Sequence, residues 1–352
     1  MKNINYKRIF VKGIDLNIVN LLTQIHEYKG RQNIYINNKK NEINKLMKQS
    51  LIDSSIYSNK IEEIEISNKR IKDILIDNEA PKSDAEEDIK GYYQVLNNLF
   101  KAEEIQLNPN FLLDLHYQLF QYSNSKVKGR FKLNDNYFLE TTLEGQKEIK
   151  FIPTKSFLIN DFVSSMCNKF NELKHDNKQN IVLPSIAFIL DFLCISPFNY
   201  GNNRISRILL NYLLNYCGFA VVKYVSLEKI IYKNHSQYQN ILQKSSYKWF
   251  ENQNNYFIFI EFILKIILQV YKEFESLFTT LEYKKIDVAK EIVKLLLKFK
   301  KLSKNELICL LPESSKRTIE RYLNSLLKNN LISKTGIGKS TKYTIKQANT
   351  KK

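Results

Sequence analysis

Apolar residues recur at helical spacing along most of this 352-residue chain. Near the amino end they fall at Leu16, Val19, Leu22 and Ile25, the spacing of one face of an α-helix. Only 9 Gly and 6 Pro interrupt the chain, so few tight turns are expected. The sequence therefore predicts a mainly α-helical fold.

The length and the charge distribution predict more than one domain. Single hydrophobic cores stop growing near ~250 residues, which is shorter than this chain. The segment from Pro81 to Asp84 interrupts the helical pattern, and residues 284–352 carry 18 Lys and Arg against 5 Asp and Glu. We therefore expect an amino-terminal helical region over residues 1–82, a core over 83–280 and a small basic domain over 284–347.

The sequence predicts a cytoplasmic protein without a membrane span. The most apolar run, Tyr256 to Tyr271, is broken every fourth residue by Glu261, Lys265 and Gln269, which indicates a buried amphipathic helix. The first ten residues are too charged for a signal peptide. Four scattered cysteines have neither zinc nor disulfide spacing, and we expect them to be reduced core residues. They are Cys167, Cys194, Cys217 and Cys309.

Residues after Leu281 are typical of a winged helix-turn-helix, because three predicted helices precede two predicted strands. Ser303 and Glu306 form a capping-box pattern, and Ser315 can cap the third helix. The strand candidates are Leu331 to Lys334 and Thr341 to Ile345.

Basic residues lie off the apolar face of the third predicted helix. They are Lys316, Arg317 and Arg321. In a winged helix this helix enters the major groove, so we expect these cations to contact DNA. A protein-contact role for the domain is the alternative.

One segment carries a candidate phosphate site. The sequence from Ser196 to Arg207 is SPFNYGNNRISR. A helix starting around Asn202 or Asn203 would present free backbone amide groups to an anion. A glycine there permits close backbone approach, and two arginines add positive charge. The candidate nucleotide-binding residues are Gly201, Asn202, Asn203, Arg204 and Arg207.

This segment resembles the active-site motif of the Fic family, HPFx(D/E)GNGRxxR. The matching residues are Pro197, Phe198, Gly201, Asn202, Arg204 and Arg207. Ser196 stands at the family's histidine, Tyr200 at its acid and Asn203 at its second glycine. The resemblance implies a helical core with ATP as cofactor and transfer of AMP to protein hydroxyls as the family's activity. It also implies that Asn202 and Arg207 contact phosphates.

The replaced positions argue against that chemistry. Ser196, at the catalytic position, cannot accept a proton at neutral pH as a histidine can, and losing a general base typically costs ~10² to 10⁴-fold in rate. A neutral Tyr200 is a poor ligand for Mg²⁺, so no metal site is expected. We interpret the core as a nucleotide-binding or regulatory module linked to DNA binding. The alternatives are an active adenylyltransferase with an atypical base and metal, and a protein-interaction scaffold without nucleotide.

Two further regions extend the resemblance. Ser58 to Glu63, SNKIEE, is similar to the family's inhibitory pattern (S/T)xxxE(G/N), which implies that Glu62 pairs with Arg207; the alternative is a solvated helix end. A predicted hairpin over Asn136 to Pro153, with a turn at Glu144-Gly145, follows the segment GRFK at residues 129–132. It is similar to the family's flap, which holds a target protein as an added strand. A surface hairpin of no special role is the alternative.

Overall fold

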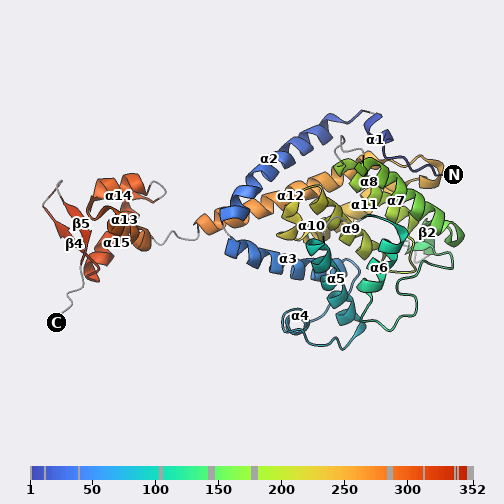
Figure 1. Cartoon of the computed structure of the whole chain (residues 1–352), viewed down its shortest axis with the longest axis horizontal. Helices are drawn as coiled ribbons and strands as arrows, with labels where there is room; N and C mark the ends of the chain where they lie inside the picture. The colour runs from blue at the N-terminus through green and yellow to red at the C-terminus, as the bar shows by residue number, and fades with distance from the viewer. Residues whose placement is uncertain are drawn as a thin grey trace. The chain divides into compact units, whose positions relative to one another are not determined.

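The computed structural model divides the chain into two compact units, Met1–Glu275 and Ser276–Lys352. Helices predominate in both, as the sequence predicts (Figure 1). The structure describes residues 2–11, 13–38, 40–102, 106–141, 147–175, 181–283, 288–311, 314–336, 338 and 341–346.

In the first unit, helices precede and follow a short β-hairpin along the sequence. Before the hairpin lie α1 (Arg8–Val11), α2 (Leu16–Asn38), α3 (Lys40–Lys60), α4 (Asn68–Leu75), α5 (Asp84–Lys101) and α6 (Pro109–Leu119). After it come α7 (Ile159–His175), α8 (Val182–Ile195), α9 (Asn202–Tyr216), α10 (Leu227–Lys233), α11 (His235–Ser246) and α12 (Tyr256–Tyr283), and the boundary between the two units falls within α12. Short 3₁₀ helices lie at Ser156–Leu158, Ala220–Lys223 and Trp249–Glu251.

Helix α8 is the centre of the first unit, because each of its residues is buried. Its sequence, VLPSIAFILDFLCI, is apolar on all sides, which suits a helix enclosed by others. Helices α7, α9 and α11 pack around it. Its one carboxylate, Asp191, accepts hydrogen bonds from Trp249 Nε1 (2.6 Å) and the Tyr256 hydroxyl (2.8 Å), so the buried charge is partnered.

The predicted boundary at residues 81–84 is where α5 begins. Ser83 caps this helix by accepting a hydrogen bond from the backbone N–H of Glu86 (3.4 Å). Helix α3, which precedes the boundary, packs against α5, α9 and α10. The end of α3 therefore lies close to the start of α9.

Helix α12 confirms the prediction of a buried amphipathic helix. Phe259, Ile263 and Ile267 are fully buried, whereas Glu261 and Lys265 pair at 2.6 Å on its exposed side. Among the residues described, no helix combines the length and the apolarity needed to cross a bilayer.

The four cysteines are free, and three of them are wholly or partly buried. The expectation of a core position is wrong for Cys309, which is exposed. It lies in the short helix α14 (Lys304–Leu310), in which only Leu307 is buried.

The predicted hairpin is present as β1 (Phe138–Thr141) and β2 (Lys147–Phe151). The strands are antiparallel, with Leu139 opposite Ile149, and β1 begins two residues later than predicted. The predicted turn at Glu144-Gly145 lies outside the described residues.

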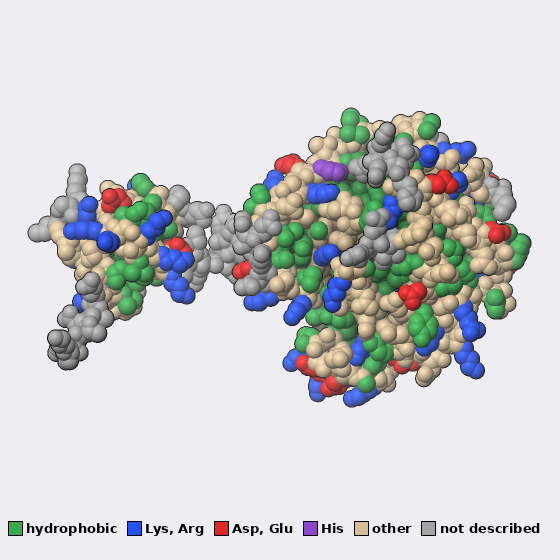
Figure 2. All heavy atoms as spheres, in the orientation of Figure 1, with side chains coloured by type: hydrophobic (Ala, Val, Ile, Leu, Met, Phe, Trp, Pro, Cys, Tyr) green, Lys and Arg blue, Asp and Glu red, His purple; other side chains and the backbone are tan. Residues whose placement is uncertain are grey.

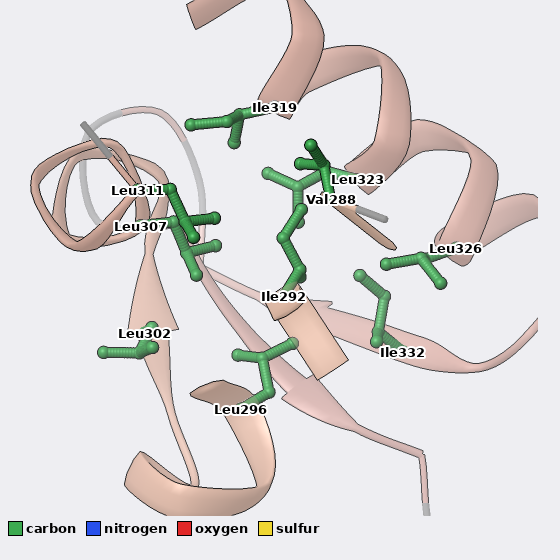
Figure 3. Packing of buried hydrophobic residues seen from close by; sticks show 10 residues of the cluster. All are labelled: Val288, Ile292, Leu296, Leu302, Leu307, Leu311, Ile319, Leu323, Leu326 and Ile332. Carbon is green, nitrogen blue, oxygen red and sulfur yellow. The ribbon is translucent and has the colours of Figure 1, made fainter. Parts of the chain in front are cut away.

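The second unit packs its helices and strands around ten buried apolar side chains that converge in Figure 3. Its elements are α13 (Val288–Phe299), β3 (Leu302–Ser303), α14, α15 (Lys316–Lys328), β4 (Ile332–Thr335) and β5 (Lys342–Ile345). Ser303 and Glu306 form the predicted capping box, with reciprocal hydrogen bonds of 3.3 and 2.6 Å. The strand order in the sheet is β3-β5-β4. Strand β3 was not predicted from the sequence, because two residues are too few to show an alternation of apolar and polar side chains. The winged-helix interpretation stays a prediction.

We expect Ile292→Ala, in the core of the second unit, to lower its free energy of unfolding by roughly 2–5 kcal/mol, because the change leaves a cavity. The control is Leu297→Ala on the same helix, where the side chain is 64% exposed. Urea unfolding of the full chain, followed by circular dichroism, measures both. Equal effects of the two changes would contradict this packing.

Candidate functional site

The loop that joins α8 to α9 starts at Ser196, which ends α8 in a left-handed conformation (φ 46°). The Ser196 backbone N–H donates to the carbonyl of Phe192, and its hydroxyl donates to the carbonyl of Leu193, both at 2.9 Å. The residue is 1% exposed. Its hydroxyl therefore completes the helix end, and nothing in this geometry makes it a base.

The middle of the loop holds its shape through Gly201 and Asn202. Gly201 has φ 79°, and a Cβ there would lie 2.7 Å from the Phe120 ring, so only glycine fits. The Asn202 side chain accepts from the Phe198 N–H (3.0 Å) and donates to the Phe198 carbonyl (2.8 Å). This amide is thus engaged with the loop's own backbone.

Tyr200, at the position of the family's acid, is held by an aromatic contact and a hydroxyl. Its ring packs edge-on against Phe120 with centroids 4.6 Å apart. Its hydroxyl donates a hydrogen bond to Ser125 Oγ. The side chain therefore offers no anionic oxygen for a metal ion.

His116 of α6 packs against the loop between α8 and α9. Its ring stacks on Phe198 with centroids 4.0 Å apart. Nδ1 accepts from the Gly129 N–H (2.9 Å), which fixes the tautomer so that Nε2–H donates to the Tyr200 carbonyl (3.2 Å). Burial lowers the pKa of His116 to about 4. Both nitrogens are occupied by backbone groups, so His116 acts as a support for the loop.

The segment GRFK, residues 129–132, lies against the same loop. The Lys132 backbone N–H donates to the Pro197 carbonyl (2.9 Å), and the Phe131 ring lies 5.5 Å from that of Phe198. The Lys132 ammonium is buried, which lowers its pKa to about 8, and it donates to Asn136 Oδ1 (2.6 Å). The loop and the hairpin are thereby connected.

Arg207 of α9 joins the loop helix to α3. Its guanidinium is 2% exposed and donates through Nε to Ser58 Oγ (2.9 Å). Nη2 donates to the Ser58 carbonyl (2.9 Å) and to Glu62 Oε1 (2.7 Å). Because the Ser58 carbonyl belongs to the last turn of α3, the cation also lies at the negative end of that helix.

The Glu62 carboxylate lies near the amino end of α9. One carboxylate oxygen binds Arg207, and the other accepts from Asn203 Nδ2 at 3.4 Å, in the first turn of α9. Burial alone would raise the pKa of Glu62, but the charge and hydrogen bond of Arg207, together with the charge of Arg204 and the hydrogen bond from Asn203, outweigh burial and lower the pKa. An ionised carboxylate thus lies where a helix amino terminus favours an anion.

Arg204 is paired in a similar way. It donates to Asp88 Oδ1 of α5 (2.8 Å) and to Asn59 Oδ1 of α3 (3.2 Å). Its guanidinium lies over the Phe120 ring, 4.8 Å from the centroid. Both arginines of the loop helix are therefore neutralised by carboxylates of neighbouring segments.

The comparisons with known proteins agree with this geometry. Residues 106–214 match the sequence profile described as Fic/DOC family. The chain carries a Fic-family domain. No curated protein sequence matches it.

Solved structures of Fic proteins resemble the whole chain or its larger part. A Fic family protein from Desulfovibrio desulfuricans G20 has a TM-score of 0.62 at 17% identity and covers 96% of this chain and 98% of its own. A Fic domain containing signaling protein from Bacteroides thetaiotaomicron VPI-5482 has a TM-score of 0.57 at 17% identity, covering 73% and 95%. Fic-1 (residues 134–508) from C. elegans has a TM-score of 0.58 at 15% identity, covering 75% and 73%. At these identities the likeness establishes the fold.

The structure brings the site residues of the first unit together. The residues that meet at the start of α9 are Ser58, Glu62, Gly201, Asn202, Asn203, Arg204 and Arg207. Ser196 lies at the other end of the same loop, where it ends α8. Sequence reasoning missed Asn59, Asp88 and the bracing role of His116. No motif or spacing marks these three, because their contacts join segments far apart in the sequence.

The predicted DNA-contacting residues lie in the second unit, on α15. Lys316, Arg317 and Arg321 are all exposed. Lys and Arg side chains are spread over the face of this unit that Figure 2 shows, with few Asp and Glu between them.

We expect His116 to make the stability of the first unit dependent on pH. Its folded-state pKa is lowered, so the unfolded chain binds the proton first, and stability present above pH ~6.5 is lost as the pH falls towards 4. The loss is at most roughly 3 kcal/mol. Urea unfolding at several pH values should show it in the wild type.

His116→Gln should remove this component of the pH dependence, whereas His26→Gln, at an exposed position, should leave it unchanged. A pH dependence identical in the wild type and His116→Gln would contradict a buried neutral histidine.

Proposed function

We propose that the first unit is a Fic-type domain that has lost AMP transfer and serves as a nucleotide-binding, regulatory module, coupled to DNA binding by the second unit. The observation that carries this proposal is the hydrogen bond that the Ser196 hydroxyl makes. Its hydroxyl donates to the end of α8 at the position where the family's chemistry needs a proton acceptor.

A metal ion does not fit the groups present at the loop. Magnesium binds through hard anionic oxygens, whereas Tyr200 is neutral and its hydroxyl is committed to Ser125.

A phosphate group does fit the chemistry at the start of α9, once Glu62 moves. The side chains of Arg207 and Asn203 now hold the Glu62 carboxylate near the amino end of α9, and this environment suits a phosphate oxygen equally well. We infer that Glu62 competes with the terminal phosphate of ATP and that α3 is the regulatory element. ATP supplies the anionic group, and this chain's residues bind and orient it.

The second unit is the proposed DNA-binding part. Its composition supports this, because residues 284–352 carry 18 Lys and Arg against 5 Asp and Glu. The hairpin from Asn136 to Pro153 is the proposed contact for a protein target, through the free edge of β1 or β2.

An active adenylyltransferase with another base and metal arrangement is the rival function. The neutralised arginines and the engaged Ser196 and Tyr200 weigh against it.

We expect the wild type to transfer no AMP to itself or to lysate proteins, measured with labelled ATP. The triple change Ser196→His, Tyr200→Glu and Asn203→Gly should revive transfer by about 10²-fold or more over Ser196→His alone, because base and metal act on one transition state. Histidine tolerates the left-handed conformation of residue 196 better than most residues.

Arg207→Ala in the triple variant is the control and should abolish the revived activity. Wild-type labelling that Arg207→Ala removes would contradict the loss of transferase activity.

We expect Glu62→Ala to strengthen ATP binding by about tenfold and ADP binding by less, because it frees Arg207 for a terminal phosphate. Glu65→Ala is the matched control, since it removes one carboxylate from the same turn region without contact to Arg207. Adding Asp88→Asn, which frees Arg204, should strengthen binding further. Calorimetry with and without Mg²⁺ measures each affinity.

Absence of ATP binding in Glu62→Ala combined with Asp88→Asn would reject the nucleotide proposal and favour the scaffold without nucleotide. A strict requirement for Mg²⁺ would favour the active transferase.

A further inference from the structure

Helix α15 presents a row of polar side chains directly opposite its buried side. The buried residues are Ile319, Leu323 and Leu326, which fix the rotation of the helix on its core. The opposite side carries Arg317, Arg321, Asn324 and Lys328, all exposed and spaced three or four residues apart. At the rise of an α-helix the row is roughly 16 Å long.

The donors of this row are available for a ligand. Among the described residues, Arg317 and Asn324 have no hydrogen-bond or ion-pair partner, and Arg321 only lies over the neighbouring Tyr322 ring, 4.9 Å from its centroid. The one acidic residue of α15, Glu320, is paired with Lys304 of α14 at 2.7 Å. The pairing neutralises the charge that would repel a polyanion from this side of the helix.

The row is also held in place. Ser315 caps α15 by accepting from the Thr318 N–H (3.1 Å), and the helix packs against α13, α14 and β4. Side chains on such a fixed helix project in set directions, so they can meet a ligand without reordering the backbone.

The chemistry of the row favours nucleic acid over a protein partner. Among the described residues of this unit, the exposed large apolar ones are Leu297, Phe299, Leu310 and Leu331, none of which belongs to α15. Protein interfaces have an apolar, aromatic centre, whereas protein–DNA interfaces are polar and positively charged. Guanidinium and amide groups on one helix face are the groups that read base edges in the major groove.

We propose that α15 lies in the major groove of duplex DNA, where Arg317, Arg321 and Asn324 read base edges. Lys328, on the same row, and the exposed Lys334 and Lys342 of the strands contact phosphates. This inference rests on the DNA-binding part of the proposed function and adds the reading residues and the bases to it.

The hydrogen-bonding groups of Arg317, Arg321 and Asn324 determine the DNA sequence that we expect α15 to bind. An arginine fork donates two hydrogen bonds to guanine, and an asparagine amide pairs with adenine. Arg317 and Asn324 are roughly 10 Å apart along the helix, which is about three base-pair steps. The site should therefore contain guanines and an adenine within about four base pairs.

Selection of binding sites from a randomised duplex, with the full-length protein, tests the proposal. The wild type should select a short guanine- and adenine-containing site, measured afterwards by fluorescence anisotropy at several salt concentrations. Arg317→Lys and Arg321→Lys keep the positive charge but lose the two parallel N–H donors of the guanidinium. Each change should therefore reduce the preference for guanine over other bases at one position by about tenfold, and the salt dependence of binding should stay the same. Asn324→Ala should relax the preference for adenine alone.

Lys298→Ala, at an exposed lysine of α13, is the control that removes a cation outside the row, and the selected sequence should not change. All four substituted residues are exposed, so urea midpoints should stay equal to that of the wild type. Selected sites that are the same for the wild type and the three row variants would overturn the reading role while leaving DNA binding intact. Absence of affinity for any duplex at low salt would overturn the DNA-binding function itself and favour a protein partner for this unit.

Discussion

The burial of Arg207 is the constraint on which the first unit depends. A guanidinium that is 2% exposed needs compensating partners, and Ser58 and Glu62 supply them. These partners come from the last turn of α3 and the residues just after it, so the pairing fastens the region before residue 83 to the loop helix α9. Removing one partner of such a pair typically costs about 3–5 kcal/mol, because a buried charge is left alone.

Ion pairs and packing contacts also hold the loop between α8 and α9. Glu62 pairs with Arg207, and Asp88 pairs with Arg204. Ser196 ends a helix, and Tyr200 joins an aromatic contact with Phe120. The side chains at residues 196, 200 and 203 are thus each held by a contact within the fold.

Local features of the fold could be predicted from the sequence, whereas long-range contacts could not. The caps at Ser83, Ser303 and Ser315 follow from bonds within three residues, so a short window contains the whole interaction. Glu62 was linked to Arg207 only through resemblance to a family. Asp88 and Asn59 were missed because α3 and α5 meet Arg204 through helix packing, which no periodicity encodes.

The Asn202 amide has a wider consequence. It binds both backbone groups of Phe198, so the turn between α8 and α9 is closed by the first residue of α9. These two bonds do not involve the side chains of residues 196 and 200. Sequence change can exchange the reacting groups on such a turn while the scaffold persists, and a motif match at its closing residues reports the ancestry of the fold rather than the survival of a reaction.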